Sequence, residues 1–222
     1  MRNTQINFED SVKAANLEFN EEPMDENYTN LIAGYPSRLR VKKILQELGD
    51  IKGKSVLDGG CEAGYISIKL LEKGANVTAI DIVEPALEKF REKIKGTNYT
   101  PIIKKGVLQN MPFASNEFDA TVCTEVLEHA SDTQKCIEEL IRVVKPGGKI
   151  IITFPNEKNR KPLYPLARLF GINTSVEPKV TLFELNINVI LKMLNSEGSS
   201  VKKYYSFPWY FPLTYLIVAE KK

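Results

Sequence analysis

The sequence predicts an α/β fold built on a doubly wound, mostly parallel sheet. Five short apolar or β-branched stretches alternate with stretches that carry apolar residues at helical spacing, which is typical of parallel strands connected by crossover helices. The chain then ends on two strand-like segments whose connection is too short for a helical crossover, so these strands either pair antiparallel or lie apart. Its 222 residues favour one domain, with or without an appendage.

Composition argues against several classes of protein. The 30 Lys and Arg residues against 28 Asp and Glu residues leave a net charge of +2, which is too balanced to indicate a nucleic-acid or membrane-surface partner. Cys61, Cys123 and Cys136 lack metal-ligand spacing and favour free thiols in a reducing compartment. No apolar run is long enough to span a membrane, and the N-terminus has no apolar core of a signal peptide. We therefore expect a cytoplasmic protein without a metal site, a nucleic-acid partner or a membrane span.

The first segment of the chain differs from the rest. Residues 1–34 are polar and acidic and are predicted to form an N-terminal extension, with a short helix over 8–19. The main domain is expected over 35–222. It begins with a predicted helix over 36–48, because its leucine and isoleucine residues share one face and Gly49 follows as a stop signal.

A strand, a glycine turn and the start of a helix come next. Residues 55–57 read as a short buried strand, Asp58 stands at its end, and apolar residues recur at helical spacing over 65–73. The turn between them holds Gly59, Gly60 and Gly64. Such glycines let a backbone approach a ligand closely, and the amides of the first helical turn face it. The following strand, 77–81, ends in Asp81, 23 positions after Asp58, which suits a carboxylate that binds the ribose hydroxyls of a nucleoside.

The alternation of strands and helices continues to the C-terminus. Further strands are predicted over residues 101–104, 118–124, 149–154, 201–206 and 213–220, and further helices over residues 84–95, 131–144 and 185–196. The helix over 131–144 is indicated by a capping box at 131–134 and by a stripe of apolar residues. Residues 149–154 are continuously apolar and β-branched, as buried parallel strands are.

Four segments carry a family resemblance. Residues 56–64 resemble motif I, V-L-D-x-G-C-G-x-G, of the class I S-adenosylmethionine-dependent methyltransferases. Residues 109–119, 124–130 and 143–153 resemble the L-P-F-x-x-N-x-F-D, E-V-L-E-H-V and L-K-P-G-G motifs of the type 11 branch, which is similar to the small-molecule methyltransferases of quinone biosynthesis. The resemblance implies a Rossmann-like, seven-stranded sheet with an antiparallel last strand. It also implies transfer of a methyl group from S-adenosylmethionine to a small organic acceptor by in-line displacement, which leaves S-adenosylhomocysteine.

The resemblance also implies the site. The cofactor-binding residues would be Asp58, Gly60, Cys61, Glu62, Gly64, Asp81, Ile82, Val107, Leu108, Gln109 and Glu125. His129, on the acceptor side, is expected to act as a base or to orient the acceptor, although it could equally help to begin the following helix. Two positions depart from the family pattern: Glu62 replaces a glycine of motif I, and Val107 replaces an aspartate that reads the adenine amine. Gln109 is a plausible substitute for that aspartate.

Other interpretations remain open at this stage. The departures at Glu62 and Val107 would also fit a degenerate domain that binds a nucleoside or a partner without turnover. Methylation of RNA or of a protein is a third hypothesis, and the balanced charge argues against RNA. Residues 155–181 are long for a connection and contain apolar side chains, so together with 207–212 they are predicted to form a lid over a partly apolar acceptor pocket, or else to plug the end of the sheet. The oligomeric state is not predicted.

Overall fold

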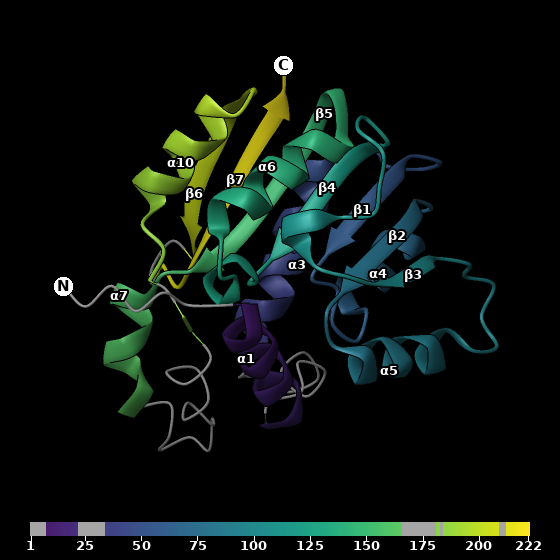
Figure 1. Ribbon diagram of the computed structural model, residues 1–222, viewed down its shortest axis with the longest axis horizontal. Helices are drawn as coiled ribbons and strands as arrows, with labels where there is room; N and C mark the ends of the chain where they lie inside the picture. Colours follow the sequence, from purple (N-terminus) through teal and green to yellow (C-terminus); the bar gives the residue numbers. More distant parts are fainter. Residues whose placement is uncertain (1–7, 22–33, 166–180, 183, 209–211) are drawn as a thin grey trace.

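The computed structural model describes residues 8–21, 34–165, 181–182, 184–208 and 212–222. A single sheet of seven strands, in the order β3-β2-β1-β4-β5-β7-β6, crosses this part of the molecule (Figure 1). The strands are β1 (Ser55–Gly59), β2 (Asn76–Asp81), β3 (Ile102–Lys105), β4 (Phe118–Thr124), β5 (Val144–Pro155), β6 (Ser199–Phe207) and β7 (Thr214–Lys221). The helices are α1 (Phe8–Glu21), α3 (Tyr35–Leu48), α4 (Tyr65–Glu72), α5 (Glu84–Ile94), α6 (Thr133–Val143), α7 (Glu157–Arg160) and α10 (Ile187–Ser196). Short 3₁₀ turns are η1 (Leu108–Asn110), η2 (Leu127–His129) and η3 (Lys161–Leu163).

The strand pairing confirms the predicted topology. β1 is parallel to both β2 and β4, and β4 is parallel to β5. β7 lies between β5 and β6 and is antiparallel to both. The two closing strands therefore pair with each other, which was one of the two possibilities left open by their short connection. The chain order reverses at β1 and β4, and ligands of doubly wound sheets bind at such a point, beyond the carboxyl ends of the strands.

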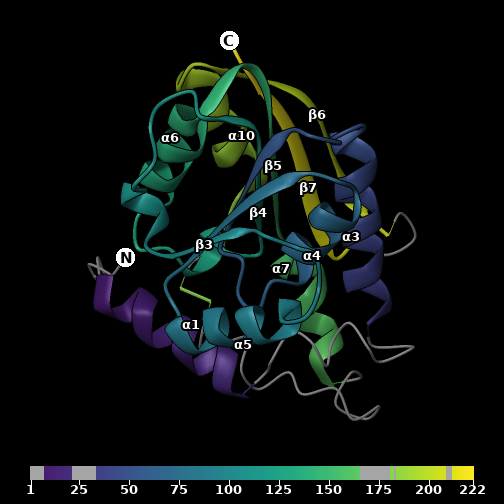
Figure 2. The same ribbon diagram turned by 90° about the vertical axis from the view of Figure 1, so that its right-hand side faces the viewer.

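Helices cover both faces of the sheet. Figure 2 shows α6 and α10 on one face and α3 and α4 on the other. Successive residues of β1 serve the two cores, because side chains alternate along a strand. Val56 packs in the core with α3 and α4, whereas Leu57 packs in the core with α6 and α10. Both side chains are fully buried. The turn after β1 is thus anchored from both sides of the sheet.

Two element boundaries differ from the prediction. The predicted capping box at 131–134 is wrong: Asp132 caps α6, and its carboxylate accepts from the backbone N–H of Lys135 at 2.9 Å. The Ser131 hydroxyl instead accepts from Gln109. β5 also begins earlier than 149, because Val144 pairs with Phe118 before the register shifts. The other predicted helices and strands that the structure describes agree within about two residues at each end.

Part of the predicted lid can be placed. Within 155–181, Pro155 ends β5, and α7 and η3 follow it. Leu166, Leu169, Phe170 and Trp209 lie outside the described residues, so the lid stays a prediction. No helix in the described ranges is both long and apolar enough to cross a membrane.

Candidate functional site

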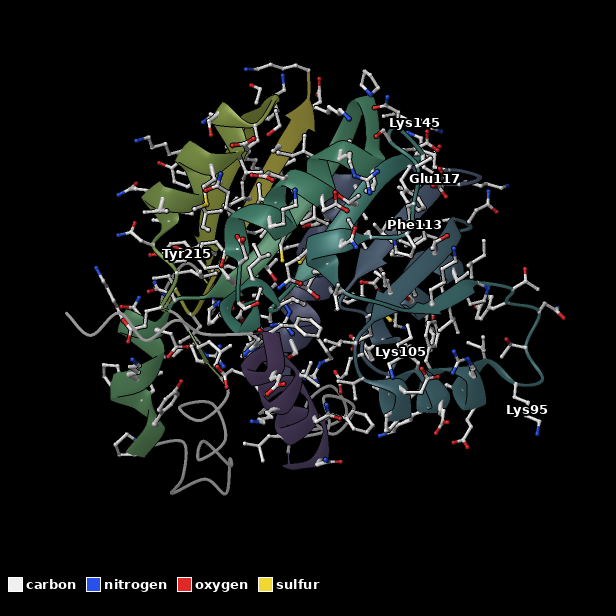
Figure 3. The ribbon with its side chains drawn as sticks, in the orientation of Figure 1. Lys95, Lys105, Phe113, Glu117, Lys145 and Tyr215 are labelled. Carbon is white, nitrogen blue, oxygen red and sulfur yellow. The ribbon has the colours of Figure 1, made fainter. Side chains whose placement is uncertain are left out.

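A pocket opens at the carboxyl ends of the central strands. It holds about 850 Å³ of empty space, including the part that is open to solvent. Its walls come from the turn after β1 (Gly60 and Glu62), the end of β2 (Ile80 to Val83), the loop Gly106 to Gln109, the segment after β4 (Thr124 to Val126, His129 and Ala130), Cys136 of α6, and α1. Figure 3 labels Lys105 at the carboxyl end of β3, and Glu117 and Lys145 toward the opposite end of the sheet.

Steric contacts explain why the turn after β1 needs glycine. Gly60 has φ 76°, and a Cβ placed there would lie 2.3 Å from Cγ2 of Val126. Gly64 has φ 79° and precedes α4, and its Cβ would lie 2.1 Å from the ring of Phe90. Both positions require a left-handed backbone that side chains disfavour. Gly60 lines the pocket, whereas Gly64 is needed for the packing behind it.

Glu62 has a positive φ of 47°, at a position where the family motif has glycine. Its backbone N–H donates to Oδ2 of Asp81 at 2.8 Å. The residue therefore takes up the left-handed conformation that glycine adopts freely, and this hydrogen bond helps to hold it there. The departure at Glu62 thus does not prevent the turn from forming.

Asp81 joins the turn after β1 to the end of β2. Besides the bond from Glu62, its Oδ1 accepts from the backbone N–H of Val83 at 2.9 Å. Burial raises the pKa of Asp81, while the amide bonds from Val83 and Glu62 oppose that rise. The carboxylate is thus fixed in direction at the pocket wall, where it can accept hydrogen bonds from ligand hydroxyls.

Asp58 lies beneath the pocket and is not among its lining residues. It is 1% exposed, and its Oδ2 accepts from Oγ of Ser67 at 2.6 Å. Its Oδ1 has no hydrogen-bond partner within the described part of the chain. Burial, helped by the negative charge of Asp81, raises the pKa of Asp58 to about 7. Cys61, also predicted to bind the cofactor, is buried outside the lining as well, and all three cysteines are free thiols.

The raised pKa of Asp58 predicts a pH dependence of stability. The folded protein keeps the Asp58 proton up to a pKa of about 7, whereas the unfolded chain releases it near 3.8. The unfolded state then binds fewer protons, so this group lowers the free energy of unfolding as pH rises through that interval. Asp58→Asn should abolish that loss. Urea titration measures the unfolding free energy of both proteins. The value for the variant minus that for the wild type should rise from pH 4 to pH 7. A constant difference would contradict the assignment.

The loop after β3 is held by an ion pair on α6. Arg142 donates to both carboxylate oxygens of Glu139, at 2.6 and 2.9 Å. It also donates to the carbonyl oxygens of Phe113 and Met111, and the N–H of Met111 donates to Glu139 at 2.7 Å. This clamp fixes the segment that follows η1. These residues are not among the predicted ones, although a Glu and an Arg three apart on a helix could have suggested such a pair.

The same loop presents Val107, Leu108 and Gln109 to the pocket, and their predicted role in cofactor binding stays a prediction. The backbone N–H of Gly106 donates to the carbonyl oxygen of Asp81 at 2.9 Å, which joins the loop to β2. The side-chain amide nitrogen of Gln109 donates to Ser131 at 3.2 Å. Its amide oxygen is a hydrogen-bond acceptor, which is what an amino group of a ligand requires.

Glu125 lines the pocket but is engaged by the protein's own cations. It has φ 53°, and its backbone N–H donates to the carbonyl oxygen of Thr153. Its carboxylate lies 3.2 Å from Arg40 and 3.5 Å from Arg160, and accepts from Oγ1 of Thr153 at 3.2 Å. Glu125 thus connects α3, the end of β4 and α7. Arg40, which the sequence did not single out, is buried in this cluster.

His129 closes η2 and lines the pocket, and its role toward the acceptor stays a prediction. Its ring is largely buried, and Nε2 lies 3.9 Å from a carboxylate oxygen of Glu128. It therefore stands on the same pocket as Asp81, at the wall formed after β4.

Helix α1 also contributes to the pocket, which the sequence did not predict. Its lining residues are Phe8, Ser11, Ala15 and Phe19. They recur at intervals of three and four and so share one helix face. Ala14 and Leu17 pack with Leu182, and α1 lies against η2. A short helix was predicted over 8–19, but nothing in the sequence showed that one of its faces lines the pocket.

The sequence is similar to those of known methyltransferases. A family model described as a methyltransferase domain, of type 11, matches residues 57–152. The ubiquinone biosynthesis O-methyltransferase of Pseudomonas fluorescens is 36% identical over 138 residues, which are 60% of this chain and 55% of that protein. That of Dechloromonas aromatica is 35% identical over 130 residues, with 57% and 54% covered. The chain thus spans about half the length of these curated relatives.

Solved structures share the fold. Magnesium protoporphyrin IX methyltransferase (ChlM) from Synechocystis PCC 6803, crystallised with S-adenosylhomocysteine, superposes with a TM-score of 0.72 at 21% identity, covering 92% of this chain and 97% of that one. The YcgJ protein from Bacillus subtilis gives 0.67 at 15% identity, with 83% and 99% covered. At such identities the likeness speaks for the fold alone. The family match over 57–152 shows that this segment is similar to a methyltransferase domain, and the strand order agrees with that fold.

Proposed function

We propose that this protein is an S-adenosylmethionine-dependent methyltransferase that acts on a small organic acceptor. One observation carries the proposal: the glycine turn, the Asp81 carboxylate and the loop Gly106 to Gln109 meet on one pocket at the reversal point of the sheet. The relatives' names, which are those of O-methyltransferases, favour a hydroxyl as the acceptor group.

The residues present suit the methyl donor. Asp81 offers acceptor oxygens to ribose hydroxyls, and Ile82 and Leu108 offer apolar surface to an adenine ring. Gln109 would supply the acceptor for the adenine amine in place of the aspartate that Val107 replaces. Gly60 allows the backbone to approach the ligand closely. The methyl donor, when bound, supplies an electrophilic methyl group on a sulfonium. The chain's own contribution is therefore to bind, to align the acceptor and to exclude water.

His129 is proposed to serve the acceptor rather than the methyl donor. It lines the pocket after β4, whereas the residues proposed for the nucleoside lie at the ends of β1, β2 and β3. An imidazole at this place can take a proton from an acceptor hydroxyl or orient it. His129→Ala should lower kcat by about 100-fold, a typical contribution of a general base, with the affinity for S-adenosylhomocysteine nearly unchanged. Full turnover of the true acceptor by the variant would assign His129 a structural role.

The acceptor is proposed to be partly apolar. Val126 and Ala130, which follow β4 beside His129, give the acceptor side of the pocket an apolar lining. A nucleic-acid substrate is not proposed, because a net charge of +2 is too small an excess of positive charge to attract a nucleic acid. A cytoplasmic location remains a prediction.

Calorimetric titration of the full chain with S-adenosylmethionine and S-adenosylhomocysteine tests the proposal. Both should bind, and a ligand at a hundred times its dissociation constant should add about 2.7 kcal/mol to the unfolding free energy. NAD, whose pyrophosphate would meet the acidic Glu62 of the glycine turn, is the control and should bind far more weakly. Absence of heat and of a thermal shift with both methyl-donor ligands at millimolar concentration would contradict the proposal.

A further inference from the structure

We infer that α1 is a wall of the methyl-donor site and that the hydroxyl of Ser11 hydrogen-bonds the bound nucleoside. The inference rests on the proposed function, because it takes the occupant of the pocket to be S-adenosylmethionine or its product. It assigns a ligand contact to a helix that lies outside the family match, which covers residues 57–152.

Helix α1 lies beside the walls that are proposed to bind the nucleoside. In Figure 1 this helix, drawn in purple, lies below α6, near the carboxyl ends of the central strands. One face of it lines the same pocket as Gly60, Asp81 and the loop Gly106 to Gln109. These are the walls proposed for the nucleoside, so a ligand that fills them lies against α1 as well.

The Ser11 side chain on this face of α1 is buried and has an unsatisfied hydroxyl. Ser11 is 8% exposed and lines the pocket, yet its Oγ has no hydrogen-bond partner among the residues that the structure describes. A buried hydroxyl without a partner destabilises a protein. Elsewhere on α1 a polar side chain is satisfied within the helix, since Asn16 donates to the carbonyl oxygen of Val12 at 2.7 Å. The Ser11 hydroxyl is therefore available to hydrogen-bond a ligand in the pocket.

The pocket walls differ in the hydrogen-bonding groups that they offer to a ligand. Asp81 and Glu62, as carboxylates, offer acceptors only, whereas a serine hydroxyl can donate. The nucleoside part of the methyl donor presents hydroxyls, which suit Asp81, and also acceptor nitrogens on its base, which need donors. Ser11 supplies a donor from the side opposite the sheet.

Matched removal of two unpaired hydroxyls tests the inference. Ser11→Ala and Thr121→Val each delete a buried hydroxyl that lacks a partner among the described residues, but Thr121 lies within β4 and does not line the pocket. Without ligand, both variants should be as stable as the wild type or more stable, because each loses an unsatisfied group. With S-adenosylhomocysteine, Ser11→Ala should bind about 3- to 10-fold more weakly and Thr121→Val should bind normally.

Hydrogen exchange on the wild-type protein gives an independent readout. Saturating S-adenosylhomocysteine should slow exchange of the amides of α1 as well as those of the glycine turn. Protection of the glycine turn without α1, or unchanged affinity of Ser11→Ala, would overturn this inference and leave the proposed function standing. Failure of the wild type to bind the ligand at all would overturn both.

Discussion

Gly64→Ala is expected to remove about 2–4 kcal/mol of unfolding free energy, through backbone strain and overpacking together. Gly64 has φ 79°, and an alanine Cβ would lie 2.1 Å from the ring of Phe90. Phe90 is fully buried and packs with Leu87 and Ala79, so its ring cannot move aside freely. The methyl group must therefore displace either the ring or the first turn of α4. Urea denaturation of variant and wild type measures the loss.

Gly96→Ala is the matched control for this prediction. Gly96 also has a positive φ, of 81°, but nothing lies within 4 Å of its added Cβ. It therefore isolates the cost of the left-handed backbone, about 1 kcal/mol. The excess loss in Gly64→Ala is the steric part. Equal losses in the two variants would show that contact with Phe90 does not fix the choice of glycine.

Asp81→Ala is expected to weaken binding of S-adenosylhomocysteine about 10- to 150-fold, or roughly 1.5–3 kcal/mol. The variant would lose the carboxylate that is proposed to hold the ribose hydroxyls. It would also release the amides of Glu62 and Val83, which Asp81 binds at 2.8 and 2.9 Å. Titration calorimetry should therefore show the lower affinity together with a modest fall in thermal stability.

Asp119→Ala separates these two effects. Asp119 also accepts a backbone N–H, that of Ser55 at 2.8 Å, and pairs with Lys145 at 2.7 Å. It lies at the start of β4, away from the carboxyl ends of the strands where the pocket opens. This variant should lose stability and keep its affinity for the ligand. If Asp81→Ala also kept its affinity while folded, the ribose assignment would be wrong.

Periodicity and turn chemistry predicted a doubly wound, mostly parallel sheet, and the family resemblance implied its seven strands and its antiparallel last strand. The alternating segments gave the parallel strands, and the short link before β7 limited the last two strands to a few arrangements. The pocket residues Gly60, Asp81, Leu108 and Gln109 follow from motif position, because the ends of neighbouring parallel strands meet at one edge of the sheet. Motifs near the ends of the strands were therefore enough to predict the pocket residues that lie at those ends.

Long-range contacts explain what the sequence did not reveal. Asp132 and Ser131 are both good caps, so only the fold decides which one begins α6. The engagement of Glu125 by Arg40 and Arg160 depends on three segments far apart in the chain. Likewise, the spacing along α1 predicts an apolar face but not that this face meets the pocket.

Transfer of a labelled methyl group tests the central claim most directly. The full chain is incubated with methyl-labelled S-adenosylmethionine and a fractionated extract of small metabolites, with Asp81→Ala as the control. The account predicts label in a small, partly apolar product and an equal amount of S-adenosylhomocysteine, both strongly reduced in the variant. Tight binding of S-adenosylmethionine by the wild type, with no label transferred to any fraction, would contradict the account and favour a domain that binds the nucleoside without turnover.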